Sequence, residues 1–128
     1  MPAWDEYKAE AKARGSLAHE VYVAVSTPTG GPEAVKAVLA EHLTYIGSLE
    51  ESGAVMFAGP LSDDSGTQMQ GVGMLVLQAA SIEEARQLVE IDPMHVSGAR
   101  AFTLRKWMIN EGSVTMTMKL SSRAVGLG

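Results

Sequence analysis

The chain has 128 residues, of which 46% are hydrophobic and 20% charged, and its formal net charge is −5 at pH 7. These values are typical of one globular domain, which at this length can bury enough apolar surface to fold without disulfide bonds. The acidic balance and the lack of a basic cluster argue against nucleic acid as a partner. Because there is no cysteine, a thiol nucleophile and a thiolate metal site are both excluded.

The N-terminal segment predicts a cytoplasmic protein. It reads Met-Pro-Ala-Trp-Asp-Glu-Tyr, which is acidic and has no apolar core of the kind found in secretion signals. No apolar run in the chain approaches the length that is needed to span a bilayer. We therefore expect no association with a membrane.

The predicted elements alternate between helix and strand along most of the chain. Helices are expected at 5–14, at 32–52 and from 82 to about 91, and strands at 19–27, 54–61, 71–79 and 100–109. Pro32 suits a first helical turn and Gly53 a helix end. Ser81 and Glu84 form a capping box, while the strand segments are rich in apolar and β-branched residues. Residues 92–99 are expected to form a turn that breaks the last of these helices.

The C-terminal segment predicts one further strand. Residues 113–120 alternate between apolar and polar side chains, which is the period of a strand. The apolar face holds Val114, Met116, Met118 and Leu120. The polar, glycine-rich residues 121–128 are expected to be loose.

The order β-α-β-β-α-β predicts an α+β fold of the ferredoxin-like kind, with an antiparallel sheet and both helices on one face. We expect this domain over residues 19–110, a helical extension at 1–18, and a strand and tail at 111–128. The second face of the sheet needs a cover, and the simplest cover is the sheet of a second copy. We therefore expect a homodimer or higher homo-oligomer whose two sheets face each other as a barrel, with the Met-rich strand helping the exchange. In the alternative, the first helix and the tail wrap the sheet of a monomer.

A histidine interrupts the apolar stripe of the helix expected at 32–52. The stripe consists of Val35, Val38, Leu39, Leu43, Ile46 and Leu49, and His42 lies on the same face. The residue pattern leaves two interpretations open. His42 is a core histidine with satisfied hydrogen bonds, or it exchanges a proton with a substrate near neutral pH.

Asp92 follows the helix that is expected to end at about residue 91, and a histidine is one possible partner for its carboxylate. A carboxylate bonded to one ring nitrogen would fix the tautomer of the imidazole and leave the other nitrogen for the substrate. Asp92 is expected at a helix C-terminus, where the helix dipole disfavours an anion, so it needs a cation or donor nearby. His42, Arg100 and Arg105 could each supply one. The alternative is that Asp92 only starts the Asp-Pro turn.

An ordered set of short motifs resembles the YCII-related family over about residues 19–108. The set consists of H-L-x-x-I-x-x-L at 42–49, G-P-L at 59–61, E-E-A at 83–85, D-P at 92–93, Gly98 and Trp107. The resemblance implies a dimeric α+β barrel and an active site built on a histidine and an aspartate, which by motif are His42 and Asp92. One relative in the family removes chloride from a chlorinated hydroxyhydroquinone without a cofactor. Muconolactone isomerases and cofactor-free monooxygenases share the broader fold. The fold alone therefore does not indicate which of these reactions the protein would catalyse.

We therefore expect an enzyme without a cofactor or metal that acts on a small cyclic or aromatic metabolite, in the manner of a lyase or isomerase of aromatic degradation. His42 would be the general acid/base and Asp92 would orient it. Tyr45, Gly59, Pro60 and His95 are candidates to line the pocket, although each also suits a structural or surface role. No nucleotide-binding loop, serine nucleophile motif or metal-ligand spacing is found. The alternatives are a non-catalytic module that binds a small ligand, and an assembly module that recruits a partner.

Overall fold

The computed structural model describes residues 1–128. Contacts divide the chain into two compact units, one formed by Glu20–Trp107 and the other by Met1–His19 together with Met108–Gly128. None of the helices is long and apolar enough to cross a membrane.

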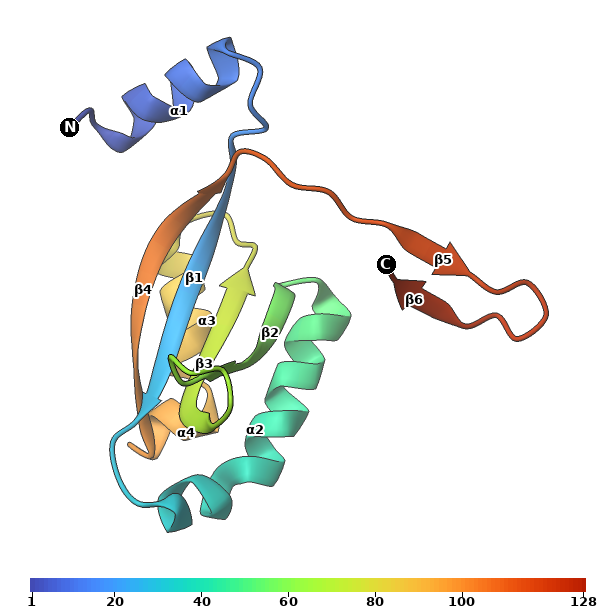
Figure 1. Cartoon of the computed structure of the whole chain (residues 1–128). Coiled ribbons are helices and arrows are strands. Elements are labelled where there is room, and N and C mark those ends of the chain that lie inside the picture. The colour runs from blue at the N-terminus through green and yellow to red at the C-terminus, as the bar shows by residue number, and fades with distance from the viewer. The chain divides into compact units, whose positions relative to one another are not determined.

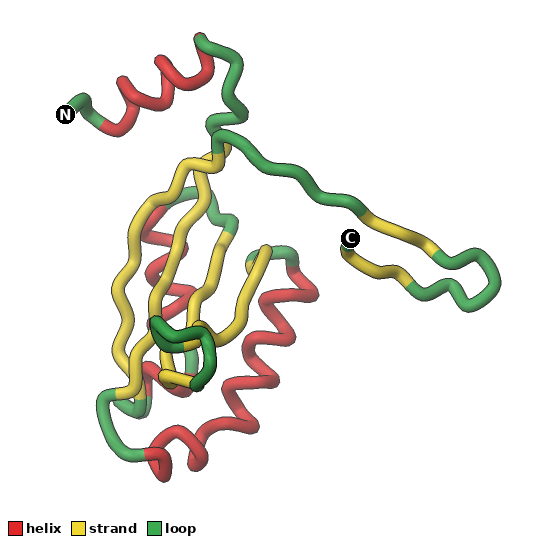
Figure 2. The backbone as a smooth tube through the Cα atoms, in the orientation of Figure 1, coloured by secondary structure: helices red, strands yellow, loops and turns green.

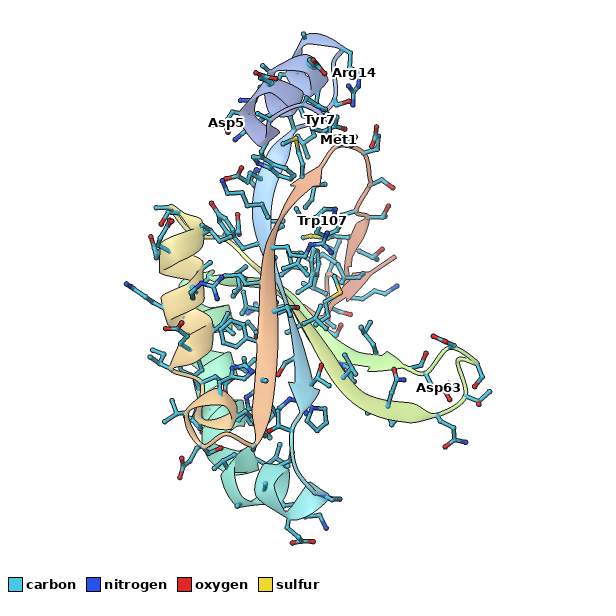
Figure 3. The ribbon with its side chains drawn as sticks, turned by 90° about the vertical axis from the view of Figure 1, so that its left-hand side faces the viewer. Met1, Asp5, Tyr7, Arg14, Asp63 and Trp107 are labelled. Atoms are coloured by element: carbon cyan, nitrogen blue, oxygen red, sulfur yellow. The ribbon has the colours of Figure 1, made fainter.

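A four-stranded antiparallel sheet forms the framework of the larger unit (Figures 1 and 2). The strands are β1 (His19–Pro28), β2 (Val55–Ser62), β3 (Met69–Leu77) and β4 (Arg100–Ile109), in the order β2-β3-β1-β4. The helices are α2 (Pro32–Ser52), α3 (Ile82–Glu90) and the four-residue α4 (Pro93–Val96). Figure 3 shows the helices on one side of the sheet. This arrangement confirms the predicted α+β, ferredoxin-like fold.

Local sequence signals set both ends of α2 and the start of α3, as expected. Pro32 begins α2, and Gly53 ends it in the left-handed conformation, with φ of 82°. Ser81 accepts a hydrogen bond from the amide of Glu84 at the start of α3, and the Glu84 carboxylate accepts one from the amide of Ala80. The capping box therefore forms, with its return bond one residue earlier than the usual pattern.

The main core lies between the sheet and the helices. Its buried members are Tyr22 and Ala24 of β1, Leu75 and Leu77 of β3, and Ala85 and Val89 of α3. Ile46 of α2 and Phe102 of β4 pack against them. Alternation along β1 therefore turns Tyr22, Ala24 and the next even position, Ser26, toward the helices.

Tyr22 makes the stability of this core dependent on pH in the alkaline range. Its side chain is 3% exposed, and burial, reinforced by the hydrogen bond to Glu20, raises the pKa of Tyr22 to about 12. Between about pH 10 and 12 the unfolded chain therefore releases a proton that the folded chain keeps, so the free energy of unfolding should fall by about 2–3 kcal/mol. The free energy of unfolding of each protein is measured by urea denaturation at about pH 9 and at about pH 11.5. In Tyr22→Phe, the fall between these two pH values should lack the part that comes from Tyr22. Equal losses in both proteins would contradict the assignment.

The smaller unit contains α1 (Trp4–Ala13) and a C-terminal hairpin. Trp4 and Tyr7 of α1 pack against Ala11, Ala18 and Met108. The Tyr7 hydroxyl accepts hydrogen bonds from Arg14 and Asn110; Figure 3 labels Tyr7 and Arg14. The extension expected as a helix at 5–14 therefore has a small apolar cluster of its own.

The C-terminal segment differs from the prediction. The strand expected at 113–120 is only β5 (Met116–Met118), and the tail expected to be loose contains β6 (Val125–Leu127), which pairs with β5 in a separate two-stranded sheet. Met116 lies opposite Leu127, and Met118 opposite Val125. The alternation of apolar residues thus continues in β6, after a turn in which Arg123 has φ of 60°. The glycine-rich composition of the tail hid this second strand from the sequence analysis.

Candidate functional site

A cavity of about 380 Å³ opens in the larger unit between α2, the sheet and the segment that holds α4. Most of its wall is apolar, and includes Val35, Leu39, Leu43 and Ile46 of α2 and Met69, Val72 and Leu75 of β3. On the sheet, Gly73 lies between Ser26 and Pro60 in one row of paired residues. These small residues leave room over the sheet, and the volume suits a small organic molecule.

His42 of α2 and Asp92 form an ion-pair geometry at the wall of the cavity. The Nδ1 atom of His42 lies 2.9 Å from Oδ1 and 2.8 Å from Oδ2 of Asp92. An ionised carboxylate only accepts hydrogen bonds, so Nδ1 carries a proton, and in the neutral ring Nε2 keeps its lone pair. The His42 side chain is 23% exposed and lines the cavity. The arrangement places a proton acceptor in an apolar cavity.

The Asp92 carboxylate is bonded by two groups, the imidazole of His42 and the backbone amide of Met94. Asp92 follows α3 and is the N-cap of α4, where its Oδ1 accepts a hydrogen bond of 2.9 Å from the amide of Met94. Its side chain is 3% exposed. The electrostatic difficulty expected of an anion after a helix is therefore relieved by the start of a second helix and by His42. Asp92 makes no ion pair with Arg100 or Arg105.

A second polar cluster, formed by Ser26, His95 and Arg100, lies at the same cavity. His95 donates from Nδ1 to the carbonyl oxygen of Val89, at 2.8 Å, so in the neutral ring its Nε2 accepts from the Ser26 hydroxyl, at 2.8 Å. The Ser26 oxygen in turn accepts from Nε of Arg100, at 2.9 Å. With His95 neutral, these hydrogen bonds run in one direction, from Arg100 to Ser26 and from Ser26 to His95.

Arg100 also donates from Nη2 to the carbonyl oxygens of Ser26 and Gly71. Burial lowers the pKa of the Arg100 guanidinium, and the negative charge of Asp92 acts in the opposite direction. The guanidinium ties β4 to β1 and β3.

The structure brings most of the predicted site residues together. Gly59, Pro60 and His95 line the cavity with His42 and Asp92. Tyr45 is not among the lining residues, because its hydroxyl donates to the carbonyl oxygen of Leu88 and so ties α2 to α3. Burial and the nearby charge of Asp92 raise the pKa of Tyr45, which keeps the phenol protonated in this packing role.

Sequence reasoning missed the part that Ser26 and His95 play in holding Arg100. One signal was available in the sequence, because Ser26 continues the alternation of Tyr22 and Ala24; in the structure it is only 4% exposed. A hydroxyl on a buried, otherwise apolar strand face must have a hydrogen-bond partner. Histidine and carboxylate side chains gather nowhere in sets of three or more that could hold a metal ion.

Comparisons with known proteins show which proteins and which family this chain resembles. An uncharacterised protein of Bacillus subtilis, YjpA, is 29% identical over 73 residues, which is 57% of this chain and 79% of that protein. A solved structure of 5-chloro-2-hydroxyhydroquinone dehydrochlorinase (TftG) from Burkholderia phenoliruptrix, in complex with 2,5-dihydroxybenzoquinone, superposes with a TM-score of 0.55 at 22% identity, over 68% of this chain and 92% of that chain. The profile of the YCII-related domain matches residues 7–108. The chain therefore belongs to the YCII-related domain family.

Proposed function

We propose that the chain is a cofactor-independent enzyme in which His42, oriented by Asp92, moves a proton on a small cyclic or aromatic metabolite. The observation that carries this proposal is the bonding of the His42 imidazole. Its Nδ1 is bonded to a buried carboxylate, and its Nε2 has no partner within the chain at the wall of an apolar cavity. Such an imidazole is a suitable general base, because the carboxylate stabilises the imidazolium that forms.

The proposed step is an elimination or an isomerisation. Nε2 of His42 takes a proton from a carbon or hydroxyl group of the ring, and the electron pair of the broken bond forms a new double bond. In an elimination a leaving group departs with its own bonding pair, and the imidazolium then releases its proton to water. In an isomerisation the imidazolium returns the proton to a different carbon of the ring.

The comparisons support the class of ligand without fixing the substrate. The structural neighbour acts on a hydroxyhydroquinone and was solved with a six-membered ring ligand, and a cavity of about 380 Å³ suits a molecule of that size. At 22% identity this likeness shows the fold alone. The proposed chemistry therefore rests on His42 and Asp92, and the neighbour indicates only which ring compounds to try first.

Exchange of substrate protons with D2O tests the proposal before the product is known. The protein is incubated with ring acids, ring lactones, phenols and 2,5-dihydroxybenzoquinone, and deuterium incorporation and new products are followed by NMR and mass spectrometry. We expect at least one compound to incorporate deuterium or to lose a leaving group only when the protein is present. Binding of compounds that are all recovered unchanged, without deuterium, would instead favour the non-catalytic binding module.

We also propose that the second face of the sheet forms a homodimer. Alternation places Val23, Val25, Met74, Phe57 and Trp107 on the face opposite the core. Phe57 is 53% and Trp107 44% exposed in a single chain, and Figure 3 shows Trp107 on the side away from the helices. An apolar sheet face of this kind needs a cover, and a second copy supplies one with the same composition.

Light scattering should therefore give a mass of twice the 13.6 kDa chain. Phe57→Asp places a charge on the proposed interface and should shift the protein toward the monomer, because a buried unpaired charge is costly. Ile91→Asp, at an exposed apolar position on the helix layer, is the matched control and should stay dimeric. A wild-type monomer at micromolar concentration would contradict the proposal.

A further inference from the structure

Arg100 is a cation of the cavity wall that takes part in no ion pair within 4.0 Å. The three hydrogen bonds of Arg100 all go to neutral oxygens, namely the hydroxyl and carbonyl of Ser26 and the carbonyl of Gly71. Its Nη1 group donates to no atom of the protein, although the side chain is half-buried and lines the cavity. The charge of Asp92 acts on Arg100 only from beyond ion-pair distance, and a half-buried guanidinium with no carboxylate bonded to it favours an anionic ligand.

The guanidinium is held in a fixed orientation. Nε and Nη2 are both engaged, and the hydroxyl that binds Nε is itself fixed by its donation to His95. Gly71 has φ of 81°, and a Cβ atom at this position would meet Cγ of Pro28 at 3.1 Å. The glycine therefore allows the backbone turn at which its carbonyl meets Arg100. A guanidinium held on two of its three nitrogens presents the third, Nη1, with little further loss of side-chain entropy.

We propose that Arg100 is the anion-binding group of this cavity, and that its Nη1 binds a carboxylate, phenolate or enolate oxygen of the ring compound on which His42 acts. This inference rests on the proposed function of the same site and names its substrate class: small ring compounds that are ionised at neutral pH. Ser26 and His95 are positioning residues, because they act on the ligand through Arg100.

The charge of Asp92 does not oppose such a ligand strongly. Both of its oxygens are bonded by Nδ1 of His42, Oδ1 also accepts from the amide of Met94, and the carboxylate is 3% exposed. The remaining wall is mostly apolar and contains no other arginine or lysine. Arg100 is therefore the group on the wall that can distinguish an anionic ring from its neutral isostere.

A matched pair of probes tests this inference without knowledge of the substrate. Benzoate and benzamide have the same shape and differ in charge, and their dissociation constants are measured by NMR titration. For the wild type we expect benzoate to bind at least about tenfold more tightly, as is typical of a charge-assisted hydrogen bond. Arg100→Met should bring the two constants to within about twofold. Ser26→Ala, which keeps the charge but loosens its hold, should reduce the preference severalfold.

Lys36→Met is the control for net charge, because Lys36 is an exposed cation of α2 that does not line the cavity. It should keep the preference for benzoate. If Arg100→Met does not fold, the inference is tested on the wild type alone. In its NMR spectra, benzoate but not benzamide should shift the side-chain nitrogen resonances of Arg100. Equal affinity of the wild type for the two probes, or an unchanged preference in folded Arg100→Met, would overturn the inference.

The same measurements separate this inference from the proposed function. His42→Gln should keep a benzoate preference within about threefold of the wild type, since Arg100 supplies the charge. A protein that prefers benzoate through Arg100 and yet exchanges no substrate proton would be a binding module for ring acids. A protein that exchanges protons but shows no anion preference would keep the proposed function and lose the role of Arg100.

Discussion

His42→Gln is expected to lower turnover by a factor of about 10²–10⁴, the usual contribution of a general acid or base. Glutamine can still donate a hydrogen bond to Asp92 from its amide, but it has no nitrogen that accepts a proton. The loss should therefore fall on the proton-transfer step. In the D2O assay, deuterium incorporation into the substrate should decrease by the same factor as product formation.

The fold should survive this substitution. His42 is partly exposed, and a side chain of similar polarity leaves the carboxylate of Asp92 with a donor. His19→Gln, an exposed histidine at the start of β1, is the matched control and should keep wild-type turnover. Full turnover in His42→Gln, on a substrate that the wild type converts, would remove His42 from the chemistry.

The sequence was sufficient for elements whose residues carry their own start and stop signals. The expected limits of 32–52 for α2 and 100–109 for β4 agree with the structure, because Pro32, Gly53 and a continuous apolar strand pattern act locally. β6 was missed because its three residues lie in a glycine-rich tail and gain strand structure only by pairing with β5. Helix α4 was missed because four residues are too few for a periodic pattern.

In the candidate site too, features that depend on contacts between distant segments could not be predicted from the local sequence. The residues alone left His42 either as a core histidine or as a catalytic one, and the family resemblance was needed to choose Asp92 as its partner. The structure adds the distance between them. The contact of Arg100 with Ser26 and Gly71 joins three strands. It depends on how those strands lie side by side, which no single segment of sequence encodes.

Asp92→Asn is expected to abolish most of the activity while the protein still folds. The asparagine side chain can accept a hydrogen bond from the Met94 amide through its oxygen, so the N-cap of α4 is preserved. Its NH2 group then takes the place of Oδ2, 2.8 Å from Nδ1 of His42, and favours the tautomer in which Nδ1 accepts a hydrogen bond. The imidazole proton moves to Nε2, the base is lost from the cavity, and turnover should fall by about 10²–10⁴.

Two further variants separate this effect from a loss of stability. Asp92→Ala removes both the cap and the partner of His42, and should lower the free energy of unfolding by about 1–3 kcal/mol. Asp64→Asn, in the exposed loop between β2 and β3, should change neither activity nor stability.

Long-range ¹H–¹⁵N NMR spectra of His42 provide the deciding measurement for Asp92→Asn. In the wild type, at a pH where the ring is neutral, Nδ1 should be the protonated nitrogen, since it donates to Asp92. In the variant Nε2 should be protonated instead. A variant that keeps its proton on Nδ1 and its full turnover would show that Asp92 caps α4 without orienting His42. The cavity would then hold a base whose tautomer is set by something other than this carboxylate.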